Sequence, residues 1–137
     1  MLDVSNEVGR LERVIVHRPG DEVVRMTQWE LEPLLFDDIL SVDVARAEHD
    51  VLVEILRHDG AQVIEVEDVL VEALQRVPAP AVQALLAQVT KGAGNPEIAP
   101  MIADWKPRRL ARALIAGVEW SELHDAPTTL SRMRVEL

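Results

Sequence analysis

The stretch "SVDVARAEHDVLVEILRHDGAQVIEVEDV", residues 41–69, decides the fold. In its first half, apolar residues recur every three or four positions, which is typical of an amphipathic α-helix. Ser41 or Asp43 suits the start of this helix, and Gly60 suits the position just after its end. The apolar run "VIEV", residues 63–66, then predicts a β-strand. We therefore expect a helix that leads directly into a strand.

A second strand precedes this helix. Val14, Ile15 and Val16 form a β-branched run that the turn-forming pair Pro19-Gly20 closes. Consecutive apolar residues, without alternation, are typical of strands buried on both faces. Strand, long connection and strand predict a βαβ unit with parallel strands. Because no third strand is evident, this unit is expected to lack cover on one sheet face and at its edges.

Short helices are predicted for residues 69–125. This part is rich in Ala and Leu and is split by prolines and glycines, and the prolines suit first helical turns. "VEWSELHDA", residues 118–126, predicts one more helical turn. The tail "PTTLSRMRVEL", residues 127–137, has no clear pattern. We expect a small helical bundle next to the α/β unit.

Composition narrows the function. The 137 residues suffice for about one domain, and the formal net charge is −10. This charge argues against nucleic acid and anionic membranes as partners, since both attract basic proteins. The chain has no cysteine, so it holds no disulfide, no thiolate metal site and no cysteine nucleophile of its own. Neither a signal peptide nor a bilayer-spanning run is evident, which predicts a cytoplasmic protein.

The acid pair Asp37-Asp38 lies in "LEPLLFDDIL", residues 31–40. Adjacent side chains point in different directions on a helix or a strand, so they are poorly placed to chelate one cation. A loop in which one carboxylate bonds a local backbone N–H is the favoured interpretation. A catalytic role or a cation site is the alternative.

Histidine is followed by aspartate three times, at His49, His58 and His124. His49 and His58 are nine residues apart, which places them on opposite faces of one helix and excludes a shared ion. His49 shares one face of the predicted helix with Ala45, Leu52 and Leu56. A buried, hydrogen-bonded histidine is therefore favoured over a metal ligand. His17 lies at a strand end, a position that can line a site. The favoured interpretation is that it merely begins the turn. No zinc-binding pattern is present, and no metal site is predicted.

"WKPRRLAR", residues 105–112, gathers one lysine and three arginines. A phosphate or partner contact is one interpretation. With a net charge of −10, a solvated helix start after Pro107 is the favoured one.

Three segments resemble bacterial arginine deiminases. "SNEVGRLERVIVHRPGDE", residues 5–22, is similar to the family's opening Glu-x-Gly-x-Leu-x-x-Val-x-Val-His-x-Pro-Gly pattern. "LEPLLFDDIL" is similar to its Leu-Leu-Phe-Asp-Asp segment, and "ARAEHDVLVEIL" to its Glu-His-Asp helix. The resemblance implies an α/β fold. Residues 1–68 would be the incomplete first βαβ module of a five-bladed α/β propeller (penteine fold), 69–125 a small α-helical bundle insertion, and 126–137 an unassigned tail.

The resemblance also implies a reaction. Arginine deiminases hydrolyse L-arginine to L-citrulline and ammonia without a cofactor, through a cysteine thiolate, a histidine and two aspartates that hold the guanidinium group. The family segments that bring these groups would follow residue 137. The chain therefore resembles the N-terminal third of a deiminase, a truncated form that is expected to be inactive alone.

Two site residues follow from the resemblance. The backbone carbonyl of Leu35 would meet the α-amino group of the substrate, and Phe36 would exclude water. Asp37 and Asp38 would shape this loop without a catalytic role. The expected partners are L-arginine in the full-length enzyme, and either a second copy or the missing C-terminal portion. The alternative function is a non-catalytic interaction module that pairs with a deiminase-like chain.

Overall fold

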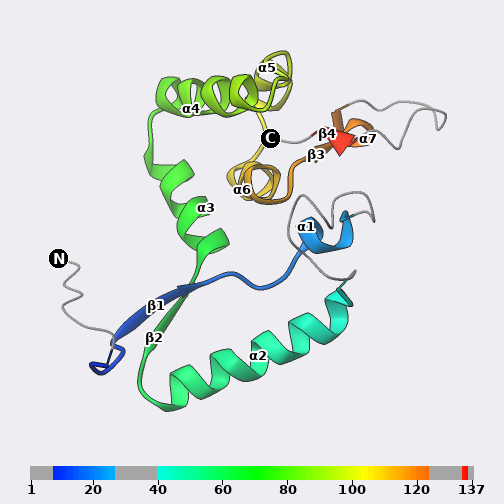
Figure 1. The fold of residues 1–137 in the computed structure, drawn as a ribbon. Helices are drawn as coiled ribbons and strands as arrows, with labels where there is room; N and C mark the ends of the chain where they lie inside the picture. Colours follow the sequence, from blue (N-terminus) through cyan, green and yellow to red (C-terminus); the bar gives the residue numbers. More distant parts are fainter. Residues whose placement is uncertain (1–7, 27–39, 124–133, 136–137) are drawn as a thin grey trace.

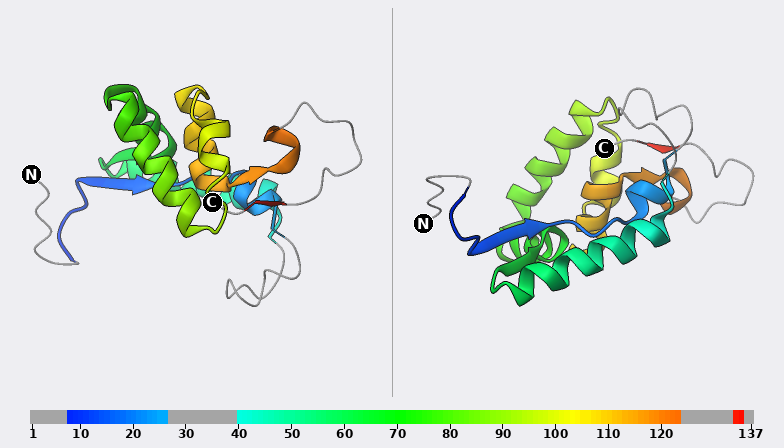
Figure 2. Two further views of the ribbon diagram at one scale, coloured as in Figure 1. Left: turned by 90° about the horizontal axis from the view of Figure 1, so that it is seen from above. Right: turned by 60° about the horizontal axis from the view of Figure 1, so that its bottom comes forward.

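The computed structural model describes residues 8–26, 40–123 and 134–135. Its elements are β1 Arg13–Val16, α1 Asp21–Val24, α2 Val42–His58, β2 Gln62–Glu65, α3 Val66–Arg76, α4 Ala79–Gly92, α5 Ile98–Ile102, α6 Pro107–Ala116, β3 Val118–Glu119, α7 Trp120–Leu123 and β4 Arg134–Val135. Figure 1 shows α2 on one side of the strands β1 and β2 and the helices α3 to α6 on the other. The right-hand view in Figure 2 agrees. The chain is thus a mixed α/β protein in which helices predominate.

The predicted strand–helix–strand unit is confirmed. β1 and β2 pair in parallel, with Val14 opposite Val63. α2 forms the crossover between them and begins after Ser41, although no side-chain hydrogen bond caps it. Gly60 follows the helix with a φ of +91°, a left-handed conformation that glycine adopts without steric cost. The sequence therefore predicts both the helix and its stop.

The second strand is shorter than its apolar run predicts. β2 ends at Glu65, and Val66, which was expected in the strand, is the first residue of α3. Glu67 and Asp68 occupy the first turn of α3, where the helix dipole favours carboxylates. This helix-start signal outweighs the β-propensity of one valine.

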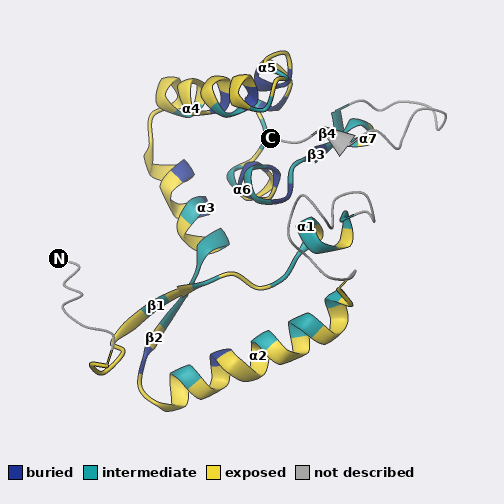
Figure 3. Cartoon of the chain, viewed as in Figure 1, coloured by how far each residue is buried: buried dark blue, intermediate teal, exposed yellow. Residues whose placement is uncertain are grey.

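The α/β unit is poorly covered in the described part of the chain, as expected because the sequence shows no evident third strand for it. β1 alternates between exposed and half-buried residues, and Ile15 is 61% exposed. The apolar runs predict strands that are buried on both faces. In this chain that prediction is wrong, because the strand residues are exposed or half-buried. Figure 3 shows that most of α2 is exposed as well. The exposed apolar side chains of this helix, which we call the α2 stripe, are Val44, Val51, Leu52 and Ile55.

The main hydrophobic core lies among the helices that follow β2, which confirms the short helices predicted there. Leu86, Ile98 and Ile102 are at most 1% exposed. Thr90 is also buried, and its hydroxyl donates to the Leu86 carbonyl at 2.9 Å. No helix in the described part of the chain is long and apolar enough to cross a membrane. The buried core residues are Val71, Leu74, Leu86, Ile98, Ala99, Ile102, Leu110 and Ala111.

The sequence does not predict a second, very small sheet. β3 pairs with β4 in antiparallel fashion, with Val118 opposite Val135. The helical turn predicted in residues 118–126 is confirmed as α7, but the two residues before it form the short strand β3. The tail, which had no predicted structure, supplies β4. Strands of two residues are too short to give a periodic sequence signal.

Candidate functional site

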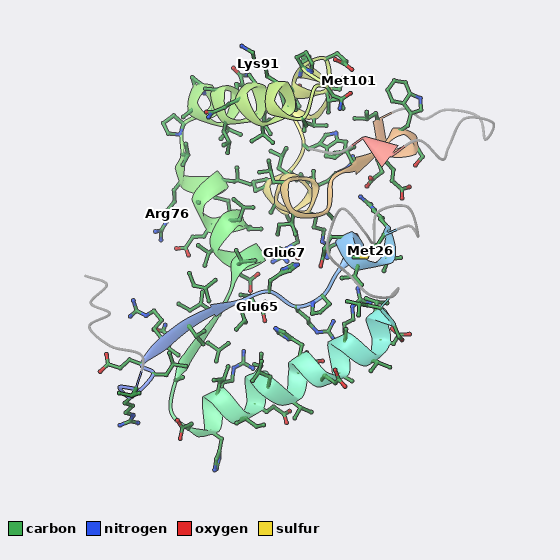
Figure 4. The ribbon with its side chains drawn as sticks, in the orientation of Figure 1. Met26, Glu65, Glu67, Arg76, Lys91 and Met101 are labelled. Atoms are coloured by element: carbon green, nitrogen blue, oxygen red, sulfur yellow. The ribbon has the colours of Figure 1, made fainter. Side chains whose placement is uncertain are left out.

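A polar cavity of about 220 Å³ lies at the carboxyl ends of β1 and β2. Ligand sites of open α/β sheets are commonly found at this edge. Figure 4 shows Glu65 and Glu67 beside this edge, where β2 leads into α3. We call it the β1-turn cavity, because its largest part is the segment that follows β1. It is lined by His17, Arg18, Pro19, Gly20, Asp21, Glu22, Arg46, Glu67, Arg112, Ile115 and Ala116.

Arg18 ties the turn after β1 to α2 and β2. Its Nε and Nη2 each donate to the Asp50 carboxylate at 2.8 Å, and its backbone N–H donates to Glu65 at 3.3 Å. The hydrogen bond to Asp50 raises the pKa of Arg18, and the same bond lowers the pKa of Asp50. Both side chains are about half exposed, so this bidentate pair contributes more to orientation than to stability.

His17 and Glu22 close the same turn. His17 Nε2 lies 2.8 Å from Glu22 Oε1, and the Gly20 N–H donates to that oxygen at 2.6 Å. Partial burial opposes ionisation of Glu22. The backbone N–H groups of Gly20 and Glu22, together with the His17 ring, outweigh this burial and lower the pKa of Glu22. Glu22 is therefore a carboxylate at neutral pH, fixed by three donors.

The arginines around the cavity have partners within the chain. Arg46 Nε donates to the Pro19 carbonyl at 2.8 Å. Arg108 Nη1 and Arg112 Nε lie 3.0 Å and 3.4 Å from Glu67 Oε1. The predicted solvated start of α6 is thus confirmed as exposed, but its arginines are ion-paired to α3. These contacts oppose a free phosphate site in "WKPRRLAR".

A second cavity of about 350 Å³ shares Asp21, Arg112 and Ala116 with the first. The Arg109 guanidinium lies over the Trp105 ring, 3.5 Å from its centroid, and also donates to the Glu122 carbonyl at 3.0 Å. This cation–π contact and the hydrogen bond hold Arg109, so all three arginines of the basic run at the start of α6 have partners within the chain.

His49 is largely buried, as predicted, but the hydrogen bond expected for its ring is not found among the described residues. Its side chain is 12% exposed, and neither ring nitrogen has a hydrogen-bond partner among the described residues. Asp50 Oδ1, which accepts a hydrogen bond from Arg18 Nε, lies 3.8 Å from Nδ1, too far for a hydrogen bond. His58, on the same helix, is exposed. The described residues also contain no group of three His, Asp or Glu side chains placed to hold a metal ion.

Replacing His49 by leucine should stabilise the chain. A buried polar atom without a partner costs on the order of 1 kcal/mol or more, and leucine of similar size removes two of them. We expect His49→Leu to raise the free energy of unfolding by about 1 kcal/mol in urea titrations. The control His58→Leu, at an exposed position, should change it by less than about 0.5 kcal/mol. A clear loss of stability in His49→Leu would mean that the ring nitrogens are bonded.

Comparison with known proteins decides the family. A sequence model described as arginine deiminase matches residues 32–119, more than half of the chain. The chain belongs to the arginine deiminase family.

Its curated relatives carry the same name. The chain is 39% identical over 133 residues to the arginine deiminase of Rhodococcus erythropolis, covering 93% of this chain and 33% of that protein. It is 38% identical over 126 residues to that of Mycobacterium avium, covering 89% and 31%. For Mycobacterium tuberculosis H37Rv the identity is 39% over 135 residues, covering 95% and 34%. The chain thus spans about a third of the length of these relatives and corresponds to the N-terminal portion of an arginine deiminase.

The site residues expected from the arginine deiminase resemblance lie outside the described residues. This holds for Leu35 and Phe36, for the acid pair beside them and for His124, so their roles stay predictions. His17 lines the β1-turn cavity, which was the less favoured of the two interpretations of this position. The contacts of Glu22, Arg25 and Arg46 were missed. Glu22 could have been found, because it follows His17 by five residues across a Pro-Gly turn, whereas Arg25 bonds to Glu122, 97 positions away.

Proposed function

We propose that this chain forms the N-terminal part of an arginine deiminase and that it is active only when the rest of such an enzyme is joined to it. The reaction is the hydrolysis of L-arginine to L-citrulline and ammonia, without a cofactor. The cysteine nucleophile must come from the complementary part, because this chain contains no cysteine. The isolated chain is therefore expected to release no citrulline from arginine.

The uncovered α/β unit carries the proposal. Ile15 of β1 is 61% exposed, and the α2 stripe leaves four apolar side chains between 50% and 60% exposed. A helix that is apolar on two sides normally lies between two layers, and an apolar patch of this kind marks an interaction face. Since the relatives are about three times as long as the matched segment, the remainder of a deiminase is the partner that fits this face.

The proposed architecture is that of one module in a larger ring. Residues 1–68 would form the first, incomplete module of a five-bladed α/β propeller, 69–125 the helical insertion and 126–137 a tail. The helical part begins at Val66, close to the proposed boundary. The proposed compartment is the cytoplasm.

The proposed substrate contacts come from the segment between α1 and α2. The backbone carbonyl of Leu35 would accept a hydrogen bond from the α-amino group of arginine, and Phe36 would exclude water. The turn His17–Gly20 would set the direction in which α1 leads into this segment, because hydrogen bonds tie this turn to α2, β2 and α1.

Ile55→Glu tests whether the α2 stripe is the joining face. Ile55 is 60% exposed, so this change should alter the stability of the chain alone by less than about 0.5 kcal/mol. In the assembled protein it would bury a charge among apolar groups. We expect association with the complementary part of the Rhodococcus erythropolis deiminase to weaken at least about tenfold, as measured by calorimetry.

The matched control is Leu85→Glu, which adds the same charge at an exposed leucine of α4, outside the stripe. It should leave the association unchanged. Equal binding by Ile55→Glu and the parent chain would show that another surface joins the parts. If the parent chain itself did not bind, the proposed function would be wrong.

A further inference from the structure

We propose that the β1-turn cavity binds a short-chain monocarboxylate, whose carboxylate is held by the terminal N–H groups of Arg46. Such a site would belong to this chain alone and is independent of the proposed deiminase reaction. Arg46 is its central residue, because this guanidinium lines the cavity and bonds only a neutral carbonyl in the described part of the chain.

The Arg46 side chain is oriented to receive a carboxylate. Arg46 lies in the second turn of α2, is half-buried, and donates from Nε to the Pro19 carbonyl at 2.8 Å. Because this carbonyl occupies Nε and fixes the guanidinium, its two Nη groups remain as a fork of donors at the cavity. A carboxylate accepts two parallel hydrogen bonds from such a fork.

The charge of Arg46 is not balanced, unlike that of the other arginines that line the cavity. Arg18 donates to both oxygens of Asp50, and Arg112 Nε lies 3.4 Å from Glu67 Oε1. No carboxylate of the described residues lies within ion-pair distance of Arg46. A half-buried cation without a counter-ion has lost part of its hydration without compensation. A small anion in the cavity would supply the missing partner.

The other charges around the cavity limit the charge of the ligand. Asp21, Glu22 and Glu67 line the same cavity. Each of these carboxylates would repel a second negative charge on a bound molecule. A monoanion therefore suits the cavity better than a phosphate or a dicarboxylate.

The size and apolar lining of the cavity limit the rest of the ligand. Its volume is about 220 Å³, and pockets for drug-sized ligands begin at about 300 Å³. Ile115 and Ala116 of α6 are the apolar residues that α6 adds to the lining. A carboxylate with a short alkyl tail, such as propionate, combines the charge for Arg46 with a tail that suits these two side chains.

Nuclear magnetic resonance on the chain alone tests the site. Propionate is titrated at constant ionic strength, and the backbone N–H signals of Gly20 and Asp21 are followed. We expect saturable shifts with a millimolar dissociation constant, as suits a small ligand held by one bidentate pair. Propionamide, which has the same shape without the charge, should give no saturable shift. No saturable shift with propionate, or equal shifts with propionamide, would overturn the proposal.

Arg46→Met should abolish the saturable shifts, because it removes the donor fork and keeps an apolar stem. The matched control is Arg57→Met, at an exposed arginine of the same helix that does not line the cavity. This control should bind propionate as the parent chain does. Arg46→Lys keeps the charge without the fork, so it should bind about tenfold more weakly, and it replaces Arg46→Met if that variant does not fold. Parent-like binding by either Arg46 variant would overturn the proposal.

Ile115→Ala tests the alkyl tail. Burying one more CH₂ group strengthens binding up to about fourfold, so the parent chain should bind propionate more tightly than acetate. In Ile115→Ala this difference should shrink, while the affinity for acetate stays the same. Tighter binding of acetate than of propionate by the parent chain would overturn the choice of an alkyl carboxylate as the ligand.

Discussion

Deleting Leu34 to Asp38 should lower the kcat/KM of the reassembled deiminase by about a hundredfold or more. The deletion removes the proposed contact of the Leu35 carbonyl with the α-amino group of arginine and the water exclusion by Phe36. A substrate that is held by its guanidinium end alone reaches the reactive geometry less often. Steady-state citrulline formation measures the effect, and calorimetry should show unchanged association, because the deletion lies outside the α2 stripe.

Asp37→Asn is the matched control for this deletion. It keeps the length and shape of the loop and removes one charge. Because a local turn role needs only a hydrogen-bonding side chain, we expect a change of a few-fold at most. If Asp37→Asn abolished activity as fully as loss of the nucleophile would, Asp37 would be a catalytic carboxylate and the proposed role of the loop would be wrong.

Ile102→Ala should destabilise the chain by about 3 kcal/mol. Ile102 is 0% exposed and belongs to the core formed by α3, α4, α5 and α6, so its truncation leaves a cavity among close-packed helices. Since the α/β unit of this chain buries few side chains, this helical core is the main source of apolar burial. Urea unfolding followed by circular dichroism measures the loss.

The neighbouring Met101→Ala is the control, because Met101 belongs to the same short helix but is 36% exposed. It should cost less than about 0.5 kcal/mol. Equal losses in the two variants would show that the helical core is not specifically packed around Ile102.

Local sequence patterns were sufficient for the βαβ unit. Helical spacing, the stop at Gly60 and the β-branched run of Val14 to Val16 each act over a few residues, so they can be read from the chain directly. The end of β2 could not be placed, because Val66 suits both a strand and the first turn of a helix. β3 and β4 could not be found, because two-residue strands depend on tertiary pairing and leave no pattern.

The charged contacts of the candidate site follow a different rule. The Arg18–Asp50 pair joins residues 32 positions apart, and the Arg25–Glu122 bond joins residues 97 positions apart. Such partners become neighbours only once the helices have packed, so spacing along the chain does not reveal them. The hydrogen bond predicted for His49 was not found for a related reason. Its apolar neighbours at helical spacing predicted burial correctly, but the adjacent carboxylate of Asp50 pairs with the distant Arg18, and the ring has no hydrogen-bond partner among the described residues.

Function came from the family resemblance and not from the local chemistry. The chain has no cysteine, and the arginines of its cavity are bonded to carboxylates and carbonyls of the same chain. Residue spacing alone therefore indicated an α/β protein without an evident active site. The family match over residues 32–119 supports the resemblance. The substrate-side roles of Leu35 and Phe36 remain proposals that the loop deletion tests.

The most direct test of the central claim is a titration. This chain is added in increasing amounts to a fixed concentration of the complementary part of the Rhodococcus erythropolis deiminase, and citrulline is measured at saturating L-arginine. We predict no citrulline from either part alone and a rate that rises until one chain is present per complementary part. Citrulline from this cysteine-free chain alone, or no citrulline at any ratio, would contradict the claim that it is the N-terminal part of an arginine deiminase that works only in the assembled enzyme.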